Sequence, residues 1–133
     1  MFLDVLQEKN REMFLEACVS VTMLDRSLTE RERKLVLAYC REMGIAEHIP
    51  QSSEGIAGIT AMLAERAEVP ERKAMALGIL AFARIDGSMD GKSGFIEELA
   101  EGLKIGKDTA ERLDFLLELC DSAYREMRRT ILG

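Results

Sequence analysis

The sequence contains no tryptophan, two prolines and one histidine, and aromatic residues make up only 5% of it. So few prolines leave long stretches of chain free to form helices. The single histidine, His48, lies beside Pro50 and has no nucleophile motif near it, so a solvated loop histidine is the simpler interpretation. Glycine-rich phosphate loops that follow a strand are also missing. We therefore expect a helical protein that is not an enzyme.

Cysteine is scarce as well: Cys18, Cys40 and Cys120 are an odd number, lie far apart and form no CxxC or Cys/His motif. This pattern argues against a disulfide framework and against a zinc site. Each cysteine occupies an apolar helical position, which predicts three reduced core thiols in a cytoplasmic protein. The N-terminus has no basic segment followed by a long apolar one, so we expect no signal peptide and no membrane insertion.

Basic residues are outnumbered by acidic ones, which gives a net charge of −6 and a pI of about 4.9. An acidic surface repels phosphate backbones, so we expect no nucleic-acid partner. The one local basic cluster is Arg125, Arg128 and Arg129, at the end of the last expected helix. Cations there complement the helix dipole and need no ligand to explain them.

What the chain does contain is a long apolar segment from Ala74 to Ala83, followed by a turn at Asp86-Gly87-Ser88. Ten residues are too few to cross a bilayer and too many for an ordinary strand, so they predict a helix buried on most of its circumference. Pro70 suits the first turn of that helix. A second helix is expected from about Ser93 to Leu103.

The same pattern occurs earlier in the chain. A shift of 61 residues places Met75, Gly78, Ile79, Phe82, Ile85, Asp86, Ser88 and Met89 on Phe14, Ala17, Cys18, Val21, Leu24, Asp25, Ser27 and Leu28. A shift of 60 places Phe95, Ile96, Leu99, Ala100, Leu103 and Ile105 on Leu35, Val36, Tyr39, Cys40, Met43 and Ile45. Two such copies indicate an internal duplication.

The duplication predicts one all-α domain, a bundle of six to seven helices with approximate internal two-fold symmetry. Its repeat units are expected at about 12–67 and 70–129, with the third and last helices in equivalent places. Thr29 and Glu32 form a capping-box pattern that starts a helix at about Glu30, which should end at Gly44. The last helix carries an apolar seam of Leu113, Leu116, Leu117, Cys120, Tyr124, Met127 and Ile131.

The unit of an apolar helix, an Asp-x-Ser-apolar turn and a helix ending in Leu-x-Ile resembles the tellurite-resistance TerB-like family. The residues that carry the resemblance are 81–89 with 96–105, and a second example at 23–29 with Glu32 and 35–45. The resemblance as a whole covers about residues 12–129. The resemblance implies a non-enzymatic, cytoplasmic helical domain tied to stress response, with metal binding suggested at its acidic turns.

From the residues themselves, the two turns have two interpretations. Asp25 and Asp86 can be helix-ending and capping residues whose neighbouring serines bond the local backbone. Alternatively, Asp25, Glu32, Asp86 and Asp90 form an acidic concavity that holds a divalent cation, Ca²⁺ or Mg²⁺, through oxygen ligands. Thermal melts of the wild type and Asp86→Ala with several divalent ions against a chelator test this second interpretation.

Residues 86–97 also fit an EF-hand-like calcium loop, with oxygen ligands at Asp86, Ser88 and Asp90 and a bidentate Glu97. Against this, Ser93 stands where paired EF-hands need an apolar residue. A further alternative is a protein–protein interaction module without a metal. Its methionine-rich helices would bind a protein partner, or the C-terminal seam would form a homodimer.

Overall fold

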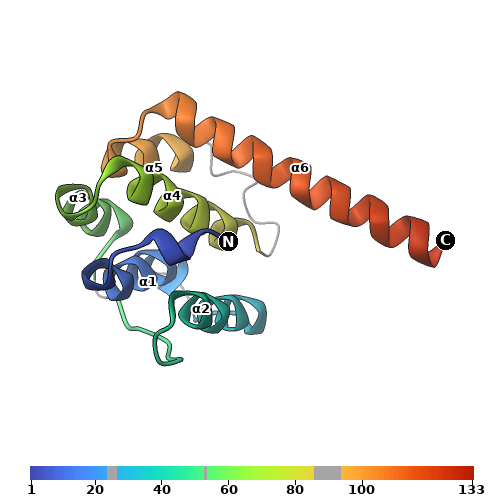
Figure 1. Ribbon diagram of the computed structural model, residues 1–133, viewed down its shortest axis with the longest axis horizontal. Helices are drawn as coiled ribbons and strands as arrows, with labels where there is room; N and C mark the ends of the chain where they lie inside the picture. Colours follow the sequence, from blue (N-terminus) through green and yellow to red (C-terminus); the bar gives the residue numbers. More distant parts are fainter. Residues whose placement is uncertain (24–26, 53, 86–93) are drawn as a thin grey trace.

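The computed structural model describes residues 1–23, 27–52, 54–85 and 94–133. These residues form one 3-10 helix and six α-helices, and no strand occurs among them. The elements, in chain order, are η1 (Leu3–Val5), α1 (Glu8–Met23), α2 (Glu30–Met43), α3 (Ile56–Arg66), α4 (Val69–Arg84), α5 (Phe95–Leu103) and α6 (Lys107–Leu132). Figure 1 shows a bundle of the shorter helices from which α6 extends to one side. The predicted all-α bundle is confirmed.

Local sequence signals place several helix ends. The Thr29 side chain accepts the Glu32 N–H at 3.1 Å, and the Glu32 carboxylate accepts the Thr29 N–H at 2.8 Å. This reciprocal capping box starts α2, as predicted. Gly44 ends the helix in the left-handed conformation, at φ 72°. Lys104 adopts the same conformation after α5, which is unusual for a residue other than glycine.

The first two helices of each half correspond closely. Both α1 and α4 contain 16 residues and are related by the 61-residue shift. The turns that end α2 and α5 share one hydrogen-bond pattern, Ile45 N–H to Cys40 O at 3.0 Å and Ile105 N–H to Ala100 O at 3.1 Å. The 60-residue shift relates these two bonds, so the copies match in backbone geometry as well as in apolar pattern.

A pair of arginines repeats in the same way. Arg11 donates from Nε to Leu6 O at 3.1 Å and from Nη1 to Met43 O at 2.7 Å. Its counterpart Arg72 donates from Nε to Ala67 O at 3.0 Å and from Nη1 to Leu103 O and Lys104 O at 3.0 and 2.9 Å. Each guanidinium ties the start of the first helix of its copy to the carbonyl end of the second, where a cation is also favoured by the helix dipole.

Equivalent residues meet where the two copies pack. Asn10 Nδ2 donates to Glu71 Oε2 at 2.6 Å, and these two residues are 61 positions apart. Both side chains are buried, at 0% and 5% exposure. A contact between residues that the repeat makes equivalent is expected where a two-fold axis relates two copies.

The third helix of each half breaks the symmetry. Helix α3 packs against α1 and α5, whereas α6 packs against α4 and α5. The predicted equivalence of these two helices is therefore wrong. In the first half residues 44–55 separate α2 from α3, whereas in the second half only residues 104–106 separate α5 from α6. A helix placed in the second half as α3 is in the first would pack between α4 and α2. The 3-10 helix η1 occupies that position instead, with Leu3 buried and the neighbouring Leu6 in the core.

The core lies between the two halves and contains Phe14, Tyr39, Met75, Leu80 and Phe82 among its buried residues. Tyr39 Oη donates to Gly78 O at 2.7 Å, so its polar end is paired inside the core. Cys18 and Cys40 are buried thiols, and burial raises the pKa of Cys18 well above its ordinary value. Cys120 is exposed, so the prediction of a third core thiol is wrong.

His48 fixes the connector after α2 to the outside of α1. Its Nε2 lies 2.8 Å from Glu12 Oε1 and its Nδ1 lies 2.8 Å from Ala46 O. Both neighbours are acceptors, so both ring nitrogens donate only in the imidazolium form. The hydrogen bond to Glu12 is the main cause that raises the pKa of His48 above its ordinary value.

We therefore expect a small pH dependence from this pair. A raised folded-state pKa means that the stabilisation is complete below the unfolded value of about 6.5 and is lost as the pH rises through the folded value. His48→Gln should lower the free energy of unfolding at pH 5.5 by roughly 0.5 kcal/mol or less, because both side chains are solvated. At pH 8.5 the same substitution should have no effect. Urea unfolding at the two pH values measures this, and an equal effect at both would contradict it.

Candidate interaction surface

Helix α6 is anchored at its start and free at its end. Ala110 is fully buried, and Leu113 and Leu117 are partly buried against the core. From Glu118 to the C-terminus every side chain except Ser122 is exposed. These last residues of the helix extend past the body of the protein (Figure 1), over about 22 Å at 1.5 Å per residue. Among the described helices, none combines the length and the apolar run needed to cross a bilayer.

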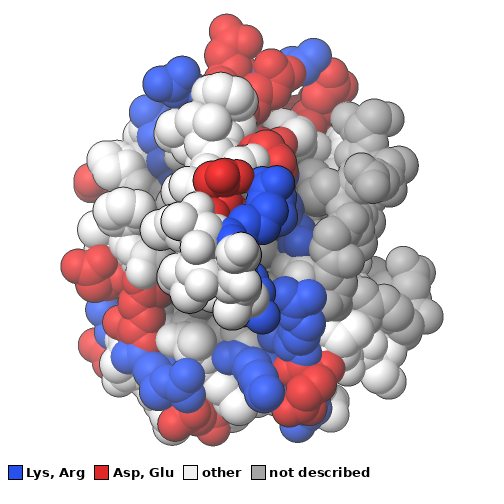
Figure 2. Space-filling model, turned by 90° about the vertical axis from the view of Figure 1, so that its right-hand side faces the viewer, with Lys and Arg blue, Asp and Glu red and all other residues white. Residues whose placement is uncertain are grey.

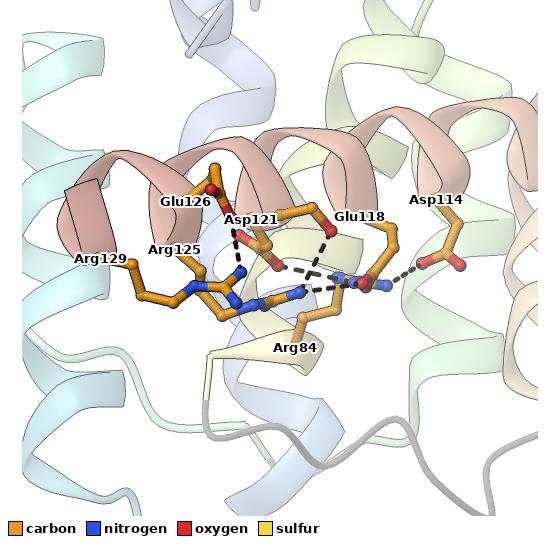
Figure 3. Close-up of polar contacts among 8 residues, drawn as sticks. Arg84, Asp114, Glu118, Asp121, Arg125, Glu126 and Arg129 are labelled. Carbon is orange, nitrogen blue, oxygen red and sulfur yellow. Dashed lines mark hydrogen bonds and ion pairs between the residues drawn. The ribbon is translucent and has the colours of Figure 1, made fainter. Parts of the chain in front are cut away.

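Arg84, the last residue of α4, holds α6 in this direction (Figure 3). Its Nη1 lies 3.0 Å from Asp114 Oδ1, and its Nη2 contacts Glu118 Oε2 and lies 3.5 Å from Asp121 Oδ2. Three acids one and two turns apart on α6 therefore share one guanidinium. Burial lowers the pKa of Arg84, but its hydrogen bonds and charge interactions with Asp114 and Glu118 outweigh this and raise it. The arginine stays charged and fixes the point at which α6 leaves the body.

The exposed part of α6 carries large apolar side chains. Tyr124 is 65% exposed, Met127 57% and Ile131 80%, and Cys120 is exposed beside them. With Leu113 and Leu117 they follow one another at alternating spacings of four and three residues. A shallow apolar depression lined by Ala123, Met127 and Ile131, among others, lies along this face. We name Cys120, Tyr124, Met127 and Ile131 the α6 seam.

Charge is unevenly distributed along the helix. Residues 107–121 contain five acids and two bases, whereas residues 122–133 contain three bases and one acid. Figure 2 views the side toward which α6 points: acidic side chains gather at the top, and basic ones lie beside uncharged surface in the middle. The helix is therefore acidic where it is anchored and basic where it is free.

The predicted cation site lies mostly outside the described residues: Asp25, Asp86 and Asp90 are not described, and neither is most of the 86–97 loop. Glu32 is described and is 1% exposed, with one carboxylate oxygen in the capping box. Across the described parts of the chain, no three His, Cys, Asp or Glu side chains form a group that could hold a metal. The divalent-cation hypothesis and its EF-hand-like alternative stay predictions.

The seam was predicted from the sequence, with a homodimer through it as one alternative, but Cys120 was expected to be buried and the role of Arg84 was not predicted. The available signal was an arginine directly after the apolar run 74–83, together with acids at Asp114, Glu118 and Asp121 on the last expected helix. That spacing of four and three residues places all three acids on one side of α6, where a single cation can reach them.

Comparisons of the chain with protein-family models, with curated proteins and with solved structures found no match. The resemblance to the TerB-like family therefore rests on the repeated helix–turn–helix motif alone.

Proposed function

We propose that this chain is a non-enzymatic, TerB-like cytoplasmic module that functions by binding another protein through the α6 seam. The observation that carries the proposal is the exposure of Tyr124, Met127 and Ile131 on a helix that extends past the body of the protein. Single exposed apolar residues are ordinary, but a contiguous apolar stripe is typical of an interaction site. Aromatic residues and methionine are also the types enriched in protein interfaces.

The way α6 is held supports the same function. The Arg84 ion pairs and the packing of Ala110 fix the base of the helix to the bundle. The first turns of α6 are therefore already held in place when a partner helix docks on the seam. This reduces the entropic cost of binding. The repeated helix pair, with Arg11 and Arg72 in equivalent places, supports the TerB-like part of the proposal.

Site-specific photo-crosslinking in cells that express the protein tests the proposal. A benzophenone amino acid at Met127 should give an adduct with another polypeptide under ultraviolet light. The same probe at Arg112, an exposed residue on the anchored part of α6, is the control. An adduct at Met127 but not at Arg112 supports the proposal. Absence of any adduct at Met127 contradicts it.

A further inference from the structure

We propose that the partner of the α6 seam is a second copy of this chain, whose own α6 pairs with it in the antiparallel direction over residues 120–131. The inference rests on the proposed function, because it names the partner of the same surface. Three features of α6 support it: the exposure of its apolar face past the body, the spacing of its apolar residues and the arrangement of its charges.

The exposed part of α6 lacks packing against the body. In proteins most helical stability comes from the packing of an apolar face rather than from helix propensity. Tyr124, Met127 and Ile131 are exposed to solvent, so this face of α6 buries little apolar surface. A second helix packed along this face would bury these side chains and stabilise the helical conformation.

The spacing of the seam matches the pairing of two helices. From Leu113 to Ile131 the apolar residues recur at alternating spacings of four and three residues, which is the a and d pattern of a two-stranded coiled coil. In the first turns this stripe packs on the body of its own chain, through Leu113 and Leu117. Past the body it continues without a partner inside the same chain, among the described residues.

The charges select the antiparallel direction. When Tyr124 lies opposite Met127 of the second copy, Cys120 lies opposite Ile131 of that copy, and Asp121 comes beside its Arg128. The two-fold symmetry forms each contact twice. In a parallel pair, the positions that flank the seam bring Asp121 next to Leu116 and Arg128 next to Ala123, with no opposite charges. Flanking charges of this kind set orientation in coiled coils.

The antiparallel arrangement also leaves room for both bodies. With residues 120–131 paired, the anchored part of the second α6 lies beyond the tip of the first. The two Leu117 positions are then about 25 Å apart along the common axis, as calculated from the rise of a helix. The bodies sit at opposite ends of the paired segment, so only the exposed ends of the helices need to meet.

Sedimentation equilibrium over a wide concentration range tests self-pairing. The wild type should rise from the monomer mass of 14.9 kDa to about twice that value as its concentration increases. Met127→Asp with Ile131→Asp should weaken the dimer at least 100-fold. Leu119→Asp with Leu132→Asp is the matched control, because both leucines are exposed on α6 but lie off the seam. The control should change the dissociation constant less than threefold.

Oxidative cross-linking tests the direction. Ile131→Cys should form a covalent dimer through Cys120 of the other copy. The wild type should not, and neither should Ile131→Cys combined with Cys120→Ser. Cys18 and Cys40 are buried and do not interfere. A covalent dimer of the wild type through Cys120 would show parallel pairing and overturn the inference.

A wild type that stays monomeric at every concentration would also overturn it. A photo-adduct at Met127 of a mass other than the dimer's would then leave the proposed function standing and assign the seam to a different protein.

Discussion

Replacing Arg72 with methionine should lower the free energy of unfolding by about 2–3 kcal/mol, because its guanidinium makes three hydrogen bonds to backbone carbonyls. Two of them are at Leu103 and Lys104, the end of α5, where helix carbonyls have no intrahelical partner. Methionine keeps much of the apolar stem but satisfies neither. Chemical unfolding followed by circular dichroism measures the loss.

Arg11, which the repeat makes equivalent to Arg72, and the exposed Arg112 serve as comparisons. Arg11→Met should cost a similar amount, because Arg11 makes the equivalent bonds to Leu6 and Met43. Arg72→Lys should recover only part of the stability, since an ammonium group lacks the planar fork that reaches several carbonyls at once. Arg112→Met, on an exposed face, should stay within about 0.5 kcal/mol of the wild type. Equal effects of Arg72→Met and Arg112→Met would contradict a stabilising role for the Arg72 hydrogen bonds.

Gly102→Ala should destabilise the protein by about 2 kcal/mol, although alanine is the better helix former. A Cβ at this position would overlap Thr60 Oγ1 and lie 3.0 Å from Thr60 Cβ. Thr60 is buried, and its hydroxyl donates toward Ile56 O and Ala57 O, so it has little freedom to move away. Helices α3 and α5 would have to separate. Urea unfolding with Gly102→Ala measures the cost.

Gly58 is the matched control for this experiment. A Cβ there meets only Glu54 Oε2, at the ordinary contact distance of 3.6 Å. Gly58→Ala should therefore stabilise α3 by about 0.5 kcal/mol, because alanine loses less conformational entropy than glycine on folding. Adding Thr60→Ala to Gly102→Ala should return part of the lost stability. A stabilising Gly102→Ala on its own would show that α3 and α5 are not in close contact.

The helical bundle and its duplication were predictable because apolar spacing records which side of each helix is buried. The shift of 61 residues that aligned Phe14 with Met75 also aligns Arg11 with Arg72, and Asn10 with Glu71. This alignment shows that Arg11 and Arg72 occupy equivalent positions in the two copies. It does not show their hydrogen bonds, because these depend on where a neighbouring helix ends.

The course of α6 was not predictable from the same signal. Its seam has the spacing of a buried face along its whole length, so Cys120 was expected in the protein's own core. Whether the seam is buried depends on how far the body of the protein extends along the helix. The position between α2 and α4, where α6 could have packed, is occupied by η1. The same apolar spacing is therefore partly buried at Leu113 and exposed at Ile131.

Of the predictions made for the acidic turns, the structure describes the capping box but not the three aspartates of the cation hypothesis. The capping box of Thr29 and Glu32 was predicted from a four-residue pattern and is confirmed, because this motif depends only on local backbone geometry. A convergence of Asp25, Asp86 and Asp90 depends on long-range geometry, and these three residues are not described. Thermal melts of the wild type and Asp86→Ala with divalent ions against a chelator test the cation hypothesis.

Hydrogen–deuterium exchange of the α6 backbone tests most directly whether this helix is stabilised by a second copy. The amides of residues 120–131 should become more protected as the concentration of the wild type increases, because pairing supplies contacts that the helix lacks in the monomer. Met127→Asp with Ile131→Asp should abolish that dependence. Protection that is the same at every concentration, in the wild type as in this variant, would contradict self-pairing through the seam.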